Sequence, residues 1–147
     1  MGFMDFVNDA KQKSLTSISK FKNKDFLEAV VAGCAMVAAA DGSIDSAEKS
    51  KMTGFINRNE ALKVFDMGQV IARFTYYAEG FAFDFNVGKA ECIKAISKIK
   101  KNPEEARIMV SVCCAIGSAD GDFDEDEKNS VREICRALDL DPKDFQL

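Results

Sequence analysis

Apolar residues recur every three or four positions along most of the chain, which is the spacing of one face of an α-helix. Phe3, Val7 and Ala10 show this period near the start, and Val70 and Phe74 show it in the middle. Strand-like alternation is confined to residues 81–85, so the pattern predicts an all-α fold. The expected helices span residues 3–19, 25–40, 45–59, 67–80, 86–101, 103–119 and 124–138, and a short turn follows Pro142.

Two of the expected segments, residues 30–40 and 108–119, are apolar on almost every face. A helix of that kind is buried on all sides, whereas a helix with one apolar stripe lies at the surface of the fold. We therefore expect both segments to be central elements, with the amphipathic helices around them.

The expected helix boundaries coincide with capping residues. Asp66 precedes Met67 and suits an N-cap, because its carboxylate can accept a hydrogen bond from an unpaired amide of the first turn. Asn102–Pro103 supplies a stop that is followed by proline at a first helical position, and Asp141–Pro142 repeats this arrangement.

Composition agrees with one compact domain over residues 1–147, since 47% of the residues are hydrophobic and 30% are charged. The net charge of -4 provides no positive field for nucleic acid, so a nucleic-acid partner is not expected. The chain has no histidine, which excludes the most common general base and the zinc sites that need histidine.

The first residues lack the long apolar core of a signal sequence, and no segment is long enough to span a bilayer. We therefore expect a soluble, cytoplasmic protein. The odd number of cysteines and the absence of a CxxC pair favour small buried residues over a disulfide framework or a zinc ribbon. These cysteines are Cys34, Cys92, Cys113, Cys114 and Cys135.

An internal repeat organises the chain. ADGSIDSAEK at 40–49 and ADGDFDEDEK at 119–128 are identical at six of ten positions, and the two Asp-Gly pairs lie 79 residues apart. The register extends into the flanking helices, where Cys34 corresponds to Cys113 and Met52 to Val131. The repeat predicts two related helix-loop-helix units, at about 25–62 and 104–140, which pack face to face around a pseudo-twofold axis.

Each repeated loop allows a purely structural interpretation. Gly42 and Gly121 would end the first helix in the left-handed conformation. Asp45 and Asp124 would cap the second helix, and the glutamate three residues later would complete a capping box. This interpretation explains the glycine, the second aspartate and the glutamate without any ligand.

A metal site is the alternative interpretation of the same loops. Asp41 and Asp120 lie beside the last carbonyl groups of a helix, where a negative charge needs compensation by a cation or by a neighbouring helix N-terminus. Carboxylate clusters suit Ca²⁺ or Mg²⁺, although the positions of glycine and glutamate are not those of an EF-hand. The candidate ligands are Asp41, Asp45, Glu48, Asp120, Asp122, Asp124 and Glu127. GSADGD at 117–122 lacks the features of a nucleotide-binding loop, so no organic cofactor is expected.

The N-terminal segment differs from the rest of the chain in its charge. Residues 1–24 carry five lysines against two aspartates and form a basic amphipathic segment. Its apolar side, within residues 3–21, would either lie on an anionic membrane surface or pack on the domain. An aromatic run follows in the middle of the chain, for which core packing and a partner-binding patch are the two interpretations. The run comprises Tyr76, Tyr77, Phe81, Phe83 and Phe85.

The two acidic segments, together with FKNKDF at 21–26, LKVFD at 62–66, FDFNVGKAE at 83–91 and DPKDF at 141–145, make the chain resemble the TerB family of bacterial tellurite-resistance proteins. The resemblance extends over essentially the whole chain. It implies an all-helical fold with two similar halves, and a role in resistance to tellurite and to phage, colicin and other stresses. It also implies binding of divalent cations by acidic residues and association with the membrane protein TerC at the cytoplasmic side.

Transferred to this sequence, the acidic signature of the family falls on Asp41, Asp45 and Glu48, and on Asp120, Asp124 and Glu127. Asp122 adds a carboxylate to the second loop, whereas Ser43 leaves the first loop with one fewer.

Three classes of function remain open. The first is a non-enzymatic stress-response protein that binds cations and docks partners, which the sequence favours. The second is a thiol-dependent tellurite reductase that uses one or more of the five cysteines. The third is a scaffold without a metal, in which capping alone explains both loops.

Overall fold

The computed structural model describes residues 24–40, 50, 53–54, 66–117 and 123–147. Within these ranges there are five α-helices and one short 3₁₀ helix, and no strand. The all-α prediction is confirmed for this part of the chain. The helices are Lys24–Ala38 (α2), Met67–Phe83 (α4), Phe85–Ser97 (α5), Pro103–Gly117 (α6), Glu125–Ala137 (α7) and the 3₁₀ helix Pro142–Phe145 (η3).

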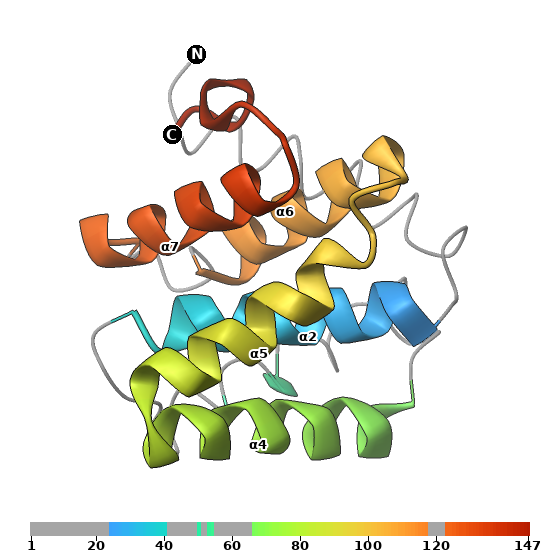
Figure 1. Ribbon diagram of the computed structural model, residues 1–147, viewed down its shortest axis with the longest axis vertical. Coiled ribbons are helices and arrows are strands. Elements are labelled where there is room, and N and C mark those ends of the chain that lie inside the picture. Colours follow the sequence, from blue (N-terminus) through green and yellow to red (C-terminus); the bar gives the residue numbers. More distant parts are fainter. Residues whose placement is uncertain (1–23, 41–49, 51–52, 55–65, 118–122) are drawn as a thin grey trace.

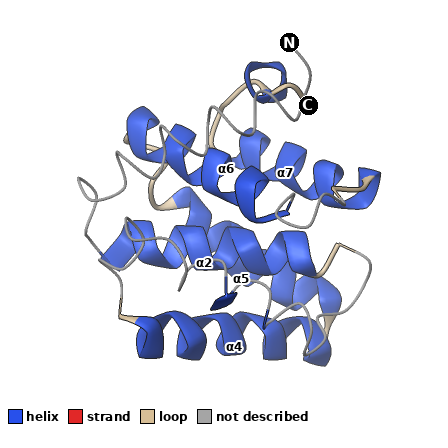
Figure 2. Ribbon diagram, turned by 180° about the vertical axis from the view of Figure 1, so that it is seen from behind, coloured by secondary structure: helices blue, strands red, loops and turns tan. Residues whose placement is uncertain are grey.

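Helix α2 lies in the middle of the bundle. It contacts α4, α5, α6 and α7, and Figure 1 shows it between α4 on one side and the pair α6 and α7 on the other. The view from behind shows the same order, with α2 and α5 between α4 and the α6–α7 pair (Figure 2). The core therefore surrounds α2 on most of its circumference.

The predicted central position of the two most apolar segments is confirmed. Eleven of the fifteen residues of α2 are buried, and α6 buries residues on both sides of its axis, including Val110 and Val112 on opposite faces. Close packing between the two helices depends on Gly33, since a Cβ at that position would lie 2.7 Å from the Sγ of Cys113.

The strand-like stretch at 81–85 is a junction between two helices. Helix α4 continues to Phe83, three residues beyond the predicted end, and Asp84 then occupies an extended conformation. The Oδ1 of Asp84 accepts hydrogen bonds from the amides of Asn86 (2.9 Å) and Val87 (3.1 Å), so one residue ends α4 and caps α5. The alternation of Phe81, Phe83 and Phe85 reflects this break and not a strand.

The predicted cap at Asp66 and the prolines that begin α6 and η3 are confirmed, and the structure shows Asn102 and Asp141 as caps as well. Asp66 accepts from the amide of Gly68 at 2.8 Å, Asn102 from that of Glu105 at 3.2 Å, and Asp141 from that of Lys143 at 2.9 Å. Helix α5 ends at Ser97, before the predicted end at 101, and turns cover residues 98–101. Pro142 begins η3, as the Asp-Pro pair predicts.

Several predictions concern residues outside the described part of the chain. The helix at 3–19 is one of them, and so is most of the helix at 45–59, in which Ser50, Thr53 and Gly54 are helical. The count of seven helices and the arrangement of two related halves therefore stay predictions. No helix within the described ranges has the length and apolar character to cross a membrane.

Candidate functional site

The acidic loops are the candidate site from the sequence, and the structure describes only the end of the second one. Five of the predicted ligands lie outside the described residues: Asp41, Asp45, Glu48, Asp120 and Asp122. Asp124 and Glu127 are described, and they lie at the start of α7.

Asp124 and Glu127 form the predicted capping box. The Oδ1 of Asp124 accepts a hydrogen bond from the amide of Glu127 at 2.8 Å, and the Oε1 of Glu127 accepts one from the amide of Asp124 at 3.2 Å. Both amides belong to the first turn of α7, where no helical carbonyl is available to them. The structural interpretation of the second loop is thus confirmed for these two residues, and it occupies one oxygen of each carboxylate.

Glu125, another carboxylate at the start of α7, forms surface ion pairs. Glu125 lies 3.3 Å from Arg132 and 4.0 Å from Lys128, and Arg132 also donates to Asn129. Among the described residues, no three acidic or cysteine side chains are arranged as a ligand set for a metal ion. A metal site at this loop therefore needs the residues at 118–122.

The end of α6, just before the second loop, packs against an aromatic ring. A Cβ at Gly117, the last residue of α6, would lie 2.8 Å from the ring of Phe123. Phe123 is the apolar residue in the repeated motif, at the position of Ile44 in the first loop. Its ring packs against the end of α6 and therefore holds the start of α7 next to that end.

Beside this loop, a hollow of about 170 Å³ lies between α2, α4, α5 and α7. Met36, Phe81 and Phe85 give it an apolar side, and Lys89 and Glu133, 2.6 Å apart, give it a charged one. Asp126 of the acidic segment also lines it. The start of α7, which carries the end of the acidic segment, therefore borders a concave surface with both apolar and charged groups.

All five cysteines are buried and none forms a disulfide, which confirms the prediction of buried cysteines. Burial raises the pKa of Cys114 and of Cys135 to about 12 each, and it raises that of Cys92 further. A hydrogen bond with Cys34, together with burial, raises the pKa of Cys113. These thiols are protonated at neutral pH, which is unfavourable for nucleophilic or redox chemistry.

The aromatic run serves two purposes. Tyr77 and Phe81 are buried in the core, whereas Tyr76, Phe83 and Phe85 are exposed, Phe83 to 84%. The interpretation as core packing is thus confirmed for two of the five residues. The exposed members lie at two different parts of α4 and at the start of α5.

A polar cluster between α2 and α4 was missed by the sequence analysis. Glu28 accepts hydrogen bonds from the Nε of Arg73 (2.6 Å) and from the hydroxyl of Tyr77 (2.5 Å). The guanidinium of Arg73 lies 4.4 Å from the ring centroid of Tyr76, a cation–π contact. The four-residue spacing of Arg73 and Tyr77 places both on one helix face, but the carboxylate that joins them lies 45 residues away in sequence.

The hydrogen bond to Glu28 raises the pKa of Arg73, although burial acts against it. Burial, followed by the hydrogen bond to Glu28, raises the pKa of Tyr77. The cluster is therefore an ion pair with a neutral tyrosine donor. The carboxylate of this pair is largely shielded from solvent, because the side chain of Glu28 is only 12% exposed.

The fold and these loops define a class: small all-helical domains that carry an acidic, capped loop between two helices. The sequence matches a known protein family. The family model described as "Tellurite resistance protein TerB" matches residues 27–147. A protein from Alcaligenes sp named "Tellurium resistance protein TerB" is 38% identical over 116 residues, covering 76% of this chain and 95% of the relative.

The chain therefore belongs to the TerB family. No solved structure matches it.

Proposed function

We propose that this protein is a non-enzymatic component of bacterial tellurite resistance. The match of residues 27–147 to the TerB family carries this proposal, together with the relative named for tellurium resistance. The names of the family and of the relative describe resistance and no reaction.

The environment of the cysteines argues against the alternative of a thiol-dependent reductase. Each thiol is buried, and the pKa is raised at four of the five. A reductase needs a thiolate that the substrate can reach. A non-enzymatic role is therefore the better explanation of the same residues.

We further propose that the acidic loops bind a divalent cation, Ca²⁺ or Mg²⁺. The second loop is the stronger candidate, because Asp120, Asp122 and Asp124 alternate along it and can contribute oxygen ligands. Capping uses the Oδ1 of Asp124, and a carboxylate has a second oxygen for a metal ion. The capping box and the metal site are thus compatible at this residue.

Cation binding would serve to dock a partner. The start of α7, where the second loop ends, borders the hollow that contains Phe81, Phe85 and Lys89. Neutralising the carboxylates of the loop would remove the repulsion that a negatively charged partner meets there. The resemblance to the TerB family favours the membrane protein TerC as that partner, at the cytoplasmic side. Contact of residues 3–21 with the membrane surface is a further proposal, and these residues lie outside the described part of the chain.

A thermal melt tests cation binding. The chelator-treated protein is melted alone and with Ca²⁺, Mg²⁺, Mn²⁺ or Zn²⁺, and the series is repeated with Asp120→Ala. A ligand present at about 100 times its Kd adds roughly 2.7 kcal/mol to the folded state, which raises the Tm by several degrees. We expect a shift with Ca²⁺ or Mg²⁺ that Asp120→Ala loses and that Asp41→Ala reduces less.

Two further variants separate binding from capping. Asp124→Ala should cost about 1 kcal/mol even without metal, because it removes the cap of α7. Asp144→Ala removes the same charge from η3, away from the loop, and should keep the full cation-dependent shift. If no cation shifts the wild-type melt, capping explains the loops and the protein is a metal-free scaffold.

A further inference from the structure

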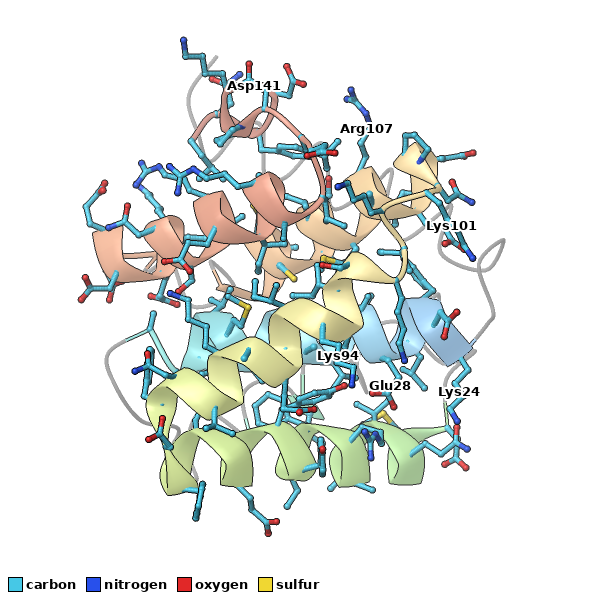
Figure 3. The ribbon with its side chains drawn as sticks, viewed as in Figure 1. Lys24, Glu28, Lys94, Lys101, Arg107 and Asp141 are labelled. Atoms are coloured by element: carbon cyan, nitrogen blue, oxygen red, sulfur yellow. The ribbon has the colours of Figure 1, made fainter. Side chains whose placement is uncertain are left out.

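A second concave site lies on the side of α2 where α4 and α5 approach it. Its volume is about 330 Å³, which falls at the lower end of the range for small-molecule sites. Figure 3 shows Lys24 and Glu28 of α2 and Lys94 of α5 on the same side of the molecule, near the gap between these helices and α4. Arg73 and Tyr76 of α4 and Lys98 of α5 complete the part of the lining that matters here.

One carboxylate that lines this cavity, that of Glu28, is already neutralised. Glu28 is bound by Arg73 at 2.6 Å and by the hydroxyl of Tyr77 at 2.5 Å, so its negative charge needs no further cation. Arg73 is held in one orientation by this pair and by the ring of Tyr76. Its side chain remains 40% exposed, which keeps the guanidinium accessible from the cavity.

Within the described part of the chain, the lysines of the cavity have no such partner. Lys24, Lys94 and Lys98 form no ion pair with any residue in the described ranges. Two more carboxylates line the cavity: Asp25, and Glu91, which lies 3.4 Å from the hydroxyl of Tyr76. Four cationic groups thus face three carboxylates, in a protein whose overall charge is -4. A local excess of positive charge in a concave site favours an anionic ligand.

We propose that this cavity binds a dianionic oxyanion group, either as a free ion or as the phosphoryl group of a small molecule. Lys24, Lys94 and Lys98 supply mobile ammonium donors, and Arg73 supplies a fixed guanidinium. A second negative charge on the ligand gains attraction from the three lysines and Arg73, and this gain exceeds the repulsion from the carboxylates because the cations that line the cavity outnumber them. The site is separate from the acidic loops and requires no divalent cation.

Isothermal titration calorimetry tests the proposal, with the full chain in low salt and in the presence of a chelator. The probes are inorganic phosphate, tellurite and adenosine monophosphate. We expect saturable binding of at least one probe and a Kd about tenfold higher for the double variant Lys94→Gln/Lys98→Gln. Tighter binding of adenosine monophosphate than of both inorganic ions would assign the site to an organic phosphate, and the reverse order would assign it to a free oxyanion.

The control is Lys101→Gln/Lys143→Gln, which removes the same charge from exposed positions outside the cavity. It should leave the Kd within about twofold, and far-ultraviolet circular dichroism should confirm that both double variants are folded. Failure of all three probes to bind would overturn the proposal, as would equal weakening by the control. Because the chelator is present throughout, either result is independent of cation binding at the acidic loops.

Discussion

At the scale of single residues, Gly88 determines how closely α5 can approach α4. A Cβ built at Gly88 would lie 2.5 Å from the backbone nitrogen of Phe81 and 2.8 Å from the carbonyl carbon of Gly80. These are backbone atoms of α4, which cannot move aside as a flexible side chain can. The helices therefore meet at a point where only glycine fits.

This contact reverses the usual effect of replacing a helical glycine. Gly→Ala inside a helix normally stabilises by up to about 1 kcal/mol, but overpacking costs about 1–3 kcal/mol. We expect Gly88→Ala to lower the free energy of unfolding by about 1–2 kcal/mol in urea denaturation. Gly80→Ala, whose Cβ would lie 3.3 Å from the Cα of Gly88, should cost less. A Gly88→Ala variant more stable than wild type would show that the helices are farther apart.

The cysteines show the same dependence on surroundings at this scale. Their spacing excludes the common metal and disulfide motifs, and burial then determines their reactivity. The identity of a residue narrows its chemistry, and the neighbours that cover it decide whether that chemistry is available.

At the scale of elements, a polar contact joins α2 to α4 within a mainly apolar interface. Glu28 is nearly covered and takes both of its hydrogen bonds from α4, through Arg73 and Tyr77. A buried carboxylate that is satisfied in this way specifies the register of two helices, because sliding either helix would leave it unpaired.

Removing the carboxylate of Glu28 should therefore lower the stability of the fold more than removing an exposed carboxylate that lines the same cavity. We expect Glu28→Ala to lower the free energy of unfolding by about 1–2 kcal/mol, because the hydroxyl of Tyr77 and the guanidinium of Arg73 lose their acceptor. The matched control is Glu91→Ala, whose side chain is exposed and, among the described residues, accepts a single 3.4 Å contact from exposed Tyr76. It should change stability by less than about 0.5 kcal/mol. Equal losses in urea denaturation would contradict this assignment.

At the scale of the whole molecule, the buried thiols make stability depend on alkaline pH. Burial raises the pKa of Cys114 from an ordinary value near 9 to about 12, so the folded chain keeps this thiol protonated while the unfolded chain ionises it. The stabilising difference is fully present below pH 9. It is lost progressively as pH rises toward 12, with a slope of about 1.4 kcal/mol per pH unit for one thiol.

We expect Cys114→Ala to be less stable than wild type at pH 7 and to lose stability less steeply between pH 9 and pH 11. Urea denaturation at a series of pH values measures both slopes. Val110→Ala is the control, since it removes packing in the same helix without a titrating group, and its curve should run parallel to that of wild type. If the Cys114→Ala curve is also parallel, the thiol does not titrate differently in the folded and unfolded chains.

The acidic loops also belong to this scale, because the two repeats lie 79 residues apart in the sequence. The capping role of Asp124 and Glu127 follows from their spacing of three positions along the chain, and it was predicted correctly. Cation binding requires several carboxylates to converge from one or two loops. The ligand positions at 41–48 and 120–122 lie outside the described residues, so cation binding stays a proposal.

The sequence alone determined the helical class of the fold, the caps at Asp66 and Asp124, the buried cysteines and the TerB family. These properties depend on local spacing or on matches along the chain, so a linear pattern contains them. The tertiary structure alone decided that Glu28 meets Arg73, that Gly88 meets Phe81 and that three lysines border one cavity. Those contacts depend on how helix faces that are distant in sequence are placed against each other, which periodicity does not specify.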